Sequence, residues 1–248
     1  MLSVDQLEDK LIDLAFAEDI GDGDHTTLCC IPEDAMGKSH LLIKEDGILA
    51  GVEVAKKVFA RFDPTMKVEV LMQDGTPVKK GDIAMVVEGK IRSLLQTERL
   101  MLNIMQRMSG IATMTAKYVK RLEGTKTHVL DTRKTTPGLR MLEKQAVKIG
   151  GGMNHRIGLF DMILLKDNHI DFAGGIDNAI DRCHAYLKEK GLNLKIEIEV
   201  RSFDELDQVL KHGGVNRIML DNFSVPNTKK AVDIIAGKYE TEIGRAHV

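Results

Sequence analysis

The second half of the chain follows a regular alternation, and this alternation constrains the fold more than any other feature. From residue 127 onward, short apolar runs of strand length are each followed by a segment with helical periodicity. The apolar runs are residues 127–130, 162–165, 194–200 and 217–220, and the helical segments are residues 139–149, 175–189, 202–212 and 225–236. Repeated strand–helix units predict a parallel sheet, open or closed, with helices packed on it.

The first half of the chain has a different pattern. Residues 5–17 carry apolar side chains at helical spacing, and residues 39–44, 67–71 and 83–88 have strand character. Asp-Gly and Gly-Asp turn signals lie between the last two of these runs. The length of 248 residues allows two domains. We therefore predict one domain at residues 1–110 and a second at residues 111–242.

A long helical pattern at residues 97–122 joins the two halves. Thr97 is a suitable N-cap, which would place Arg99 in the first helical turn. A cation at that position opposes the helix dipole. Arg99 is therefore either an ordinary surface arginine or a residue with a task other than helix stability.

The composition excludes several classes of protein. The chain has 43% hydrophobic residues and a net charge of -2, a composition typical of a globular protein. A general nucleic-acid binder would normally be basic overall. Residues 1–10 lack the basic start and apolar run that are typical of a signal peptide, and no apolar stretch approaches the length that a membrane helix needs. Cys29, Cys30 and Cys183 lack metal-type spacing, so we expect reduced thiols that act as small apolar residues, and a cytoplasmic location.

Each predicted strand of the second half ends in ionisable residues. In parallel α/β folds, ligands bind at the carboxyl ends of the strands. Four charged ends in succession are hard to explain by solvation alone. The charged ends are Asp131–Lys134, Lys166–His169, Glu197 with Glu199, and Asp221 with Asn222.

The two signs of charge are separated along the sequence. The cations come from early strand–helix units: Arg133, Lys134, His155, Arg156 and Lys166. The anions Glu199 and Asp221 come from later ones. This separation favours an anionic substrate that lies against a group that becomes positive during reaction or carries a metal. Arginine suits a carboxylate, because its planar fork pairs with both oxygens.

Several short blocks of the sequence form a recognisable set: residues 24–27 (DHTT), 109–113 (SGIAT), 132–140 (TRKTTPGLR), 151–156 (GGMNHR), 166–169 (KDNH), 197–200 (EIEV) and 220–222 (LDN). Together they resemble the quinolinate phosphoribosyltransferase family. The resemblance covers nearly the whole chain, and the TRKTTPG and KDNH blocks are highly specific in combination. A molybdenum-transport-associated family shares the TRK block, but its counterpart of KDNH differs, which makes it the weaker alternative.

The resemblance implies both a fold and a reaction. The fold would be an N-terminal α/β sandwich domain followed by an incomplete, TIM-like parallel α/β barrel. The pyridine nitrogen of quinolinate would attack the ribose C1 of phosphoribosyl pyrophosphate. Pyrophosphate and carbon dioxide would leave, and nicotinate mononucleotide would form as part of NAD biosynthesis.

The resemblance also implies roles for individual residues. The substrate-binding set would be Arg99, Thr132, Arg133, Lys134, His155, Arg156, Lys166, Glu199 and Asp221. Within that set, Lys134, Glu199 and Asp221 would be catalytic, and the two acids would help to place Mg²⁺ on the substrate. Arg99 would reach the active site of a neighbouring subunit, which implies a homodimer or a hexamer.

Two alternatives to this function stay open at the sequence level. A non-catalytic binding subunit could use the same fold, because fold alone does not determine function. A related transferase could act on nicotinate instead, although a monocarboxylate would not need so many cations.

The C-terminal residues depart from the family pattern. Residues 242–248 (EIGRAHV) can be encoded by a common sequencing-adapter sequence, and residues 243–248 have no predicted strand, cap or helix. We therefore expect residues 243–248 to be non-native and the barrel to lack its last strand units. An incomplete barrel predicts little activity for the chain as written.

Overall fold

The computed structural model describes residues 3–247, and only the backbone is described for residues 246 and 247. The chain forms two compact units, of which the first ends at His155 and the second begins at Arg156. The domain boundary predicted at residue 110 stays a prediction.

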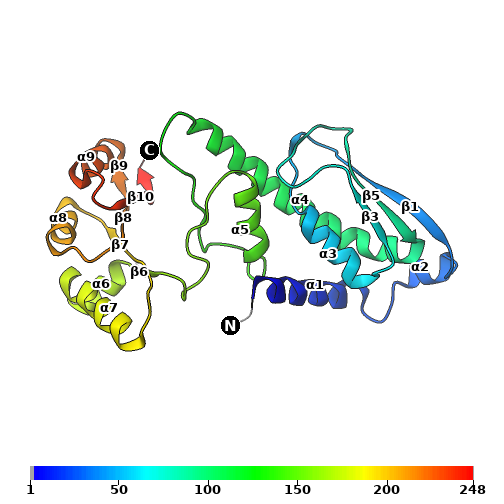
Figure 1. The fold of residues 1–248 in the computed structure, drawn as a ribbon, viewed down its shortest axis with the longest axis horizontal. Coiled ribbons are helices and arrows are strands. Elements are labelled where there is room, and N and C mark those ends of the chain that lie inside the picture. Colours follow the sequence, from blue (N-terminus) through cyan, green and yellow to red (C-terminus); the bar gives the residue numbers. More distant parts are fainter. Residues whose placement is uncertain (1–2, 248) are drawn as a thin grey trace. The chain divides into compact units, whose positions relative to one another are not determined.

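A three-stranded antiparallel sheet organises the first unit (Figure 1). Its order is β1-β5-β3, and a separate antiparallel pair consists of β2 and β4. β5 is central, which explains why four consecutive residues from Ala84 to Val87 are all buried. The strands are β1 (Met36–Leu42), β2 (Gly47–Ile48), β3 (Lys67–Val70), β4 (Pro77–Val78) and β5 (Ile83–Lys90). The three strands predicted in this half are confirmed, with shifted ends.

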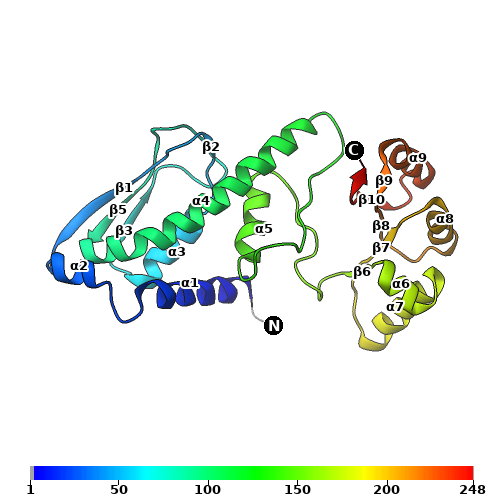
Figure 2. The same cartoon turned by 180° about the vertical axis from the view of Figure 1, so that it is seen from behind.

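Five helices complete the described part of the first unit. They are α1 (Val4–Ile20), α2 (His25–Cys30), α3 (Val52–Phe62), α4 (Ile91–Arg121) and α5 (Arg140–Ile149). α3 and α4 lie beside one another and share a core with β5 (Figures 1 and 2). Even the 31-residue α4 carries many charged side chains. Among the described residues, no helix has the length and apolar character that crossing a membrane requires.

The start of α4 corrects the prediction made for Thr97 and Arg99. α4 begins at Ile91, directly after β5, so Thr97 lies inside the helix. Thr97 is fully buried, and its hydroxyl donates to the carbonyl of Ser93 at 2.8 Å instead of capping the helix. Arg99 therefore lies well beyond the first turn, and the argument from the helix dipole is wrong. The end of the preceding strand, and not a capping side chain, sets the start of the helix.

The second unit is built on a parallel sheet with the order β10-β8-β7-β6. The described strands of the second unit are β6 (Ile163–Leu165), β7 (Ile196–Val200), β8 (Arg217–Leu220), β9 (Phe223–Ser224), β10 (Glu240–Ile243) and β11 (Ala246–His247). β9 and β11 form a separate pair outside the four-stranded sheet. Three of the predicted strand–helix units are confirmed here. The predicted strand at residues 127–130, in the first unit, is reduced to one isolated bridge between Leu130 and Met153.

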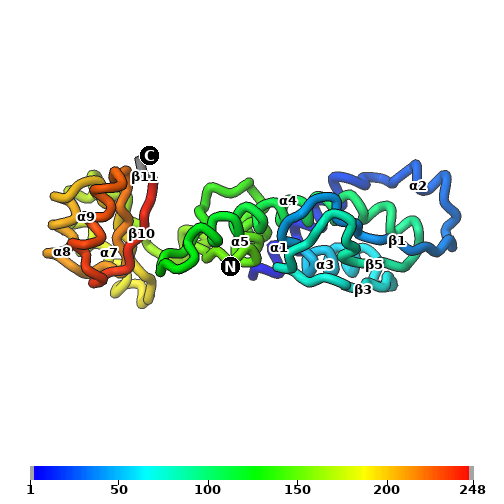
Figure 3. The backbone as a smooth tube through the Cα atoms, turned by 90° about the horizontal axis from the view of Figure 1, so that it is seen from above, coloured from blue at the N-terminus to red at the C-terminus, as the bar shows by residue number. Residues whose placement is uncertain are grey.

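The helices of the second unit cover one face of this sheet (Figures 1 and 3). They are α6 (Asp167–Ala173), α7 (Ile176–Lys190), α8 (Phe203–His212) and α9 (Val225–Ile235). Ile196, Ile198 and Val200 of β7 belong to the apolar core under these helices. Because side chains alternate along a strand, Glu197 and Glu199 point to the opposite face. The parallel-sheet α/β architecture is thus confirmed.

The end of the described chain differs from its prediction. β10 was not predicted from the sequence, and it pairs in parallel with β8, with Ile243 opposite Leu220. The short β11 pairs in parallel with β9. The prediction that residues 243–248 lack strand character is therefore wrong for Ile243, Ala246 and His247, and Val248 lies outside the described residues. The reason is that the exposed edge of β8 offers backbone groups to any segment that can lie beside it.

Candidate active site

The predicted site residues fall into two groups, one in each compact unit. In the first unit, the loop after Leu130 carries three of them. The hydroxyl of Thr132 accepts a hydrogen bond from the N–H of Lys134 at 2.9 Å, which forms a tight local turn. Arg133 is half-buried, and its Nε makes no hydrogen bond within the described residues. Lys134 is exposed. Two cations thus emerge from one short turn.

Neighbouring helices hold this loop in place. Arg107 of α4 donates to the hydroxyl of Thr136 at 2.5 Å and from its Nε to Glu143 of α5 at 2.8 Å. Arg140 of α5 donates to the carbonyl of Arg133 at 3.4 Å. The loop is therefore tied to two helices by arginine side chains. The sequence does not indicate this role for Arg107 or Glu143, because nothing in their spacing shows that the loop folds back onto them.

A buried ion pair that the sequence does not predict lies beside His155. Lys144 of α5 lies 2.5 Å from Asp131, and both side chains are under 9% exposed. The backbone N–H of His155 donates to Asp131 at 2.9 Å, and its carbonyl accepts from Lys144 at 3.0 Å. The backbone of a predicted substrate-binding residue is thus fixed by two opposite charges.

In the second unit, Lys166 and Glu199 lie together. Their Nζ and Oε1 atoms are 2.6 Å apart, with Lys166 at the end of β6 and Glu199 on the neighbouring β7. The N–H of Lys166 also donates to Nδ1 of His169, which fixes the backbone where α6 begins. A cation and a carboxylate therefore meet at the carboxyl end of the parallel sheet.

Asp221 lies at the end of the next strand along the sheet. Its N–H donates to the carbonyl of Val200 at 3.0 Å, and its Oδ2 lies 3.4 Å from Arg245. Asn222 has a φ of 63°, a conformation that asparagine adopts more readily than most residues. Glu199 pairs in register with Met219, two residues before Asp221. Glu199 and Asp221 are thus placed at the same edge of adjacent strands.

Two predicted residues have other surroundings. Arg156 is 9% exposed, and its Nη1 donates to the carbonyl of Met162 at 3.2 Å, so part of its guanidinium serves the local backbone. Arg99 is exposed on α4 and has no hydrogen-bond or ion-pair partner among the residues the structure describes. The roles predicted for both residues stay predictions.

The acids Glu199 and Asp221 fit the ligand type that Mg²⁺ prefers, because Mg²⁺ takes oxygen ligands and usually combines one or two carboxylates with substrate phosphates. Each acid uses one oxygen in its ion pair, with Lys166 and Arg245 respectively. The second oxygen of each makes no hydrogen bond with another described residue.

Comparison with protein families gives one result over most of the chain. The model described as "Quinolinate phosphoribosyl transferase, N-terminal domain" matches residues 24–109. The model described as "Quinolinate phosphoribosyl transferase, C-terminal domain" matches residues 111–244.

Individual relatives agree with these matches. The chain is 44% identical over 247 residues to "Quinolinate phosphoribosyltransferase [decarboxylating] 1b" of Nicotiana tabacum, covering 94% of this chain and 70% of the relative. It is 37% identical to "Probable nicotinate-nucleotide pyrophosphorylase [carboxylating]" of Bacillus subtilis, covering 94% of this chain and 79% of the relative.

Two solved structures are similar to the chain over nearly its whole length. The nicotinate-nucleotide pyrophosphorylase of Francisella tularensis has a TM-score of 0.90 at 38% identity, covering 100% of this chain and 85% of that one. NadC of Streptococcus pyogenes also has a TM-score of 0.90, at 39% identity, covering 99% of this chain and 85% of that one.

Proposed function

Because the chain belongs to the quinolinate phosphoribosyltransferase family, we propose that it transfers the phosphoribosyl group of phosphoribosyl pyrophosphate to quinolinate. The products are nicotinate mononucleotide, pyrophosphate and carbon dioxide. The observation that carries the proposal is the Lys166–Glu199 ion pair at the carboxyl end of the parallel sheet, 2.6 Å between Nζ and Oε1. Lys166 of this pair can bind the anionic acceptor, and Glu199 can stabilise the positive charge that develops on the ribose.

The acceptor in this proposal is a dianion, and the cations have the task of binding it. We assign the quinolinate carboxylates to Arg133, Lys134, His155, Arg156 and Lys166. Thr132 supports them through the turn that it forms with Lys134. In the free chain, the ammonium group of Lys166 is paired with Glu199. A quinolinate carboxylate that binds Lys166 would compete for this ammonium group. The Glu199 oxygen released in this way could then face the ribose.

Departure of pyrophosphate gives the ribose C1 the character of an oxocarbenium ion. Glu199 and Asp221 then stabilise positive charge by electrostatic attraction, an effect that is strongest for groups fixed before the reaction. Mg²⁺, held by these acids and the substrate phosphates, would neutralise charge on the departing pyrophosphate. The loss of carbon dioxide needs no protein base, because the quaternised pyridinium nitrogen accepts the electron pair, and the cations keep the ring oriented.

We also propose that the active enzyme is a homodimer or a larger assembly in which Arg99 serves the neighbouring subunit. An arginine that is exposed and has no partner among the described residues supports this role, since its charge is available to another chain. The cytoplasmic location likewise stays a prediction, which cell fractionation would test.

The function is tested by incubating the chain with phosphoribosyl pyrophosphate, Mg²⁺ and either quinolinate or nicotinate. We expect about 100-fold more nicotinate mononucleotide from quinolinate than from nicotinate, which lacks one charged group for the cations to bind. Equal transfer to nicotinate would support the other transferase. Binding of quinolinate without any product would support a non-catalytic subunit.

A further inference from the structure

A buried ion pair in the first unit lies directly beside the predicted quinolinate-binding loop. Asp131 is 8% exposed and Lys144 3%, and their charged atoms are 2.5 Å apart. Asp131 immediately precedes the Thr132–Lys134 turn, whereas Lys144 projects from α5. Burying two charges is costly and is often no better for stability than an apolar pair. The position of the pair therefore calls for another explanation.

The pair fixes the backbone of His155 from both sides. One oxygen of Asp131 accepts from Lys144 and from the His155 N–H, and the same ammonium donates to the His155 carbonyl. In the amide orientation that satisfies its neighbours, Asn154 donates to the other oxygen of Asp131 at 2.8 Å and to the carbonyl of Lys144 at 2.9 Å. The backbone N–H and carbonyl of His155 and the side-chain amide of Asn154 are thus all held by one charge pair.

The same contacts join two segments that lie far apart in the sequence. The N–H of Met153 donates to the carbonyl of Val129 at 2.8 Å, and the N–H of Asp131 donates to the carbonyl of Met153 at 3.2 Å. These two bonds form a single bridge and not a ladder, since Leu130 and Met153 are an isolated pair. A single bridge sets the register of the two segments weakly. The ion pair therefore supplies the constraint that a longer strand pairing would give.

From this geometry we propose that Asp131 and Lys144 are positioning residues for acceptor recognition. They hold the backbone of His155 and the start of the Thr132–Lys134 turn in one fixed arrangement, so that these side chains meet the quinolinate carboxylates without further ordering. Neither residue is catalytic, because each acts through His155 and the turn. The inference rests on the proposed function, since it assigns a purpose to the site that binds quinolinate.

The test replaces both charges by apolar side chains of similar size, in the double variant Asp131→Leu with Lys144→Met. An apolar pair of matching shape leaves no uncompensated charge, so we expect the melting temperature to stay close to that of the wild type. We expect the quinolinate Kd, measured by titration calorimetry, to rise by about 10-fold or more, because small displacements of binding groups are expensive.

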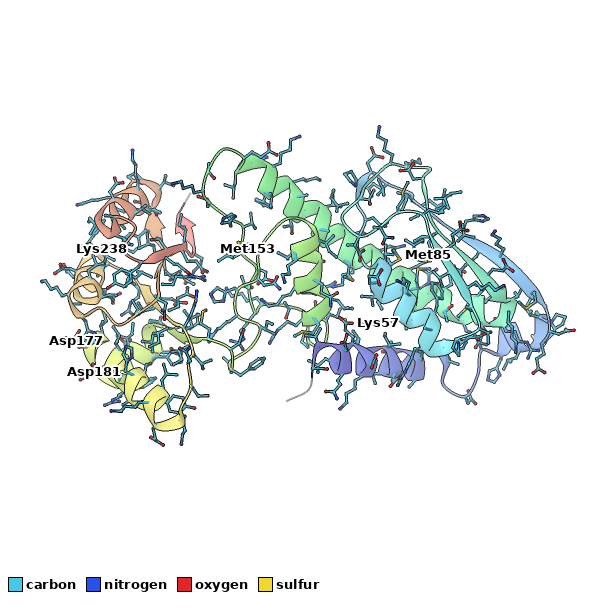
Figure 4. All side chains as sticks on the ribbon, viewed as in Figure 1. Lys57, Met85, Met153, Asp177, Asp181 and Lys238 are labelled. Atoms are coloured by element: carbon cyan, nitrogen blue, oxygen red, sulfur yellow. The ribbon has the colours of Figure 1, made fainter. Side chains whose placement is uncertain are left out.

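The matched control is another ion pair in the same unit, in which the carboxylate is buried and the lysine is partly exposed. Glu8 of α1 is 2% exposed and lies 2.5 Å from Lys57 of α3, which is labelled in Figure 4. None of the predicted site residues forms part of this pair. The double variant Glu8→Leu with Lys57→Met makes the same chemical exchange, and we expect it to bind quinolinate as tightly as the wild type does.

A second variant keeps the test decisive if the apolar exchange prevents folding. Asp131→Glu retains the charge pair but moves the carboxylate by one methylene, so the chain should fold while the anchor of His155 shifts. We expect about 10-fold weaker quinolinate binding from this variant. Wild-type affinity in the folded Asp131 variants would overturn the inference and leave the proposed function intact. A wild-type chain that binds no quinolinate would instead contradict the proposed function, and this inference with it.

Discussion

In the free chain, Lys166 and Glu199 are each other's ion-pair partner, but their charged groups are not equally exposed to solvent. Lys166 is 40% exposed and Glu199 14%, so the ammonium group is reachable from solvent while the carboxylate is largely covered. An incoming carboxylate would therefore meet Lys166 before it meets Glu199. The pair is an electrostatic arrangement that an anionic ligand can rearrange.

Removing the cation of this pair should damage the reaction strongly. We expect Lys166→Met to lower kcat/KM for quinolinate by about 100-fold, because a charge-assisted contact to the acceptor is lost. Lys188→Met is the matched control, since Lys188 is an exposed lysine of α7 in the same unit. Steady-state kinetics on both variants checks the prediction, and equal losses in the two would contradict a specific role for Lys166.

His212, at the end of α8, gives the second unit a predictable pH dependence. Its ring faces the carbonyl of Gly213 and a carboxylate oxygen of Asp181, the latter labelled in Figure 4. The bond to the Gly213 carbonyl is the main cause that raises the pKa of His212 above its usual 6.5. A raised pKa means that the charged ring stabilises the fold below pH 6.5, and this stabilisation is lost as the pH rises through the raised value.

His212→Gln should therefore remove this part of the pH dependence. Urea unfolding at about pH 6 and about pH 8.5 measures the difference in each protein. We expect the wild type to lose more stability than the variant between these two conditions. A variant with the same pH dependence as the wild type would show that His212 contributes nothing to it.

Charged residues in specific motifs at strand ends could be predicted as site residues from the sequence. Residues that hold those side chains in place could not. The KDNH and LDN blocks contain residues that lie directly after strands, such as Lys166 and Asp221. Lys144 and Arg107 were given no role from the sequence, because their importance comes from the chain folding back onto them. A lysine in a helical pattern is normally exposed, and only the structure reveals that Lys144 is buried.

At the scale of elements, β10 depends on a network of charges around Arg217 of β8. Arg217 lies 2.8 Å from Glu240 and 3.0 Å from Glu242, both on β10, and 3.6 Å from Glu197 on β7. Glu197 is fully buried, so its charge needs compensation. One arginine thus joins three neighbouring strands on the face opposite the helices.

Arg217→Met should destabilise the second unit more than a typical surface substitution does. We expect a loss of about 3 kcal/mol in the free energy of unfolding, because removing one partner leaves a buried carboxylate without that cation. Lys211→Met, which breaks an exposed pair with Asp207, should cost much less, because solvent screens an exposed pair. Urea titration of the two variants measures both losses in the free energy of unfolding. Equal losses would show that the network around Arg217 stabilises the fold no more than an exposed ion pair does.

The elements themselves were predictable where the local pattern was strong. β8 was predicted at its observed bounds, and α8 and α9 within a residue at each end, since alternation and caps such as Ser202 and Ser224 are local signals. The start of α4 and the existence of β10 were missed. Both are decided by tertiary structure, namely the end of β5 and the open edge of β8.

At the scale of the whole molecule, the proposal that Arg99 serves a neighbouring subunit has a direct consequence. Arg99→Ala should leave the melting temperature unchanged, because the side chain is exposed, and yet abolish activity. Mixing this variant with Lys166→Met should restore about a quarter of the wild-type activity in a dimer, because half of the randomly mixed dimers would contain one intact site. Activity measured before and after subunit exchange tests this. No recovery would mean that Arg99 acts within its own chain or not at all.

The central claim is that this chain couples phosphoribosyl transfer to the loss of the 2-carboxylate of quinolinate. The most direct measurement supplies quinolinate labelled in that carboxylate, together with phosphoribosyl pyrophosphate and Mg²⁺, and follows labelled carbon dioxide and nicotinate mononucleotide together. The account predicts that the two products appear in equal amounts and only when phosphoribosyl pyrophosphate is present. Mononucleotide formed from nicotinate at the same rate, or carbon dioxide released without phosphoribosyl pyrophosphate, would contradict it.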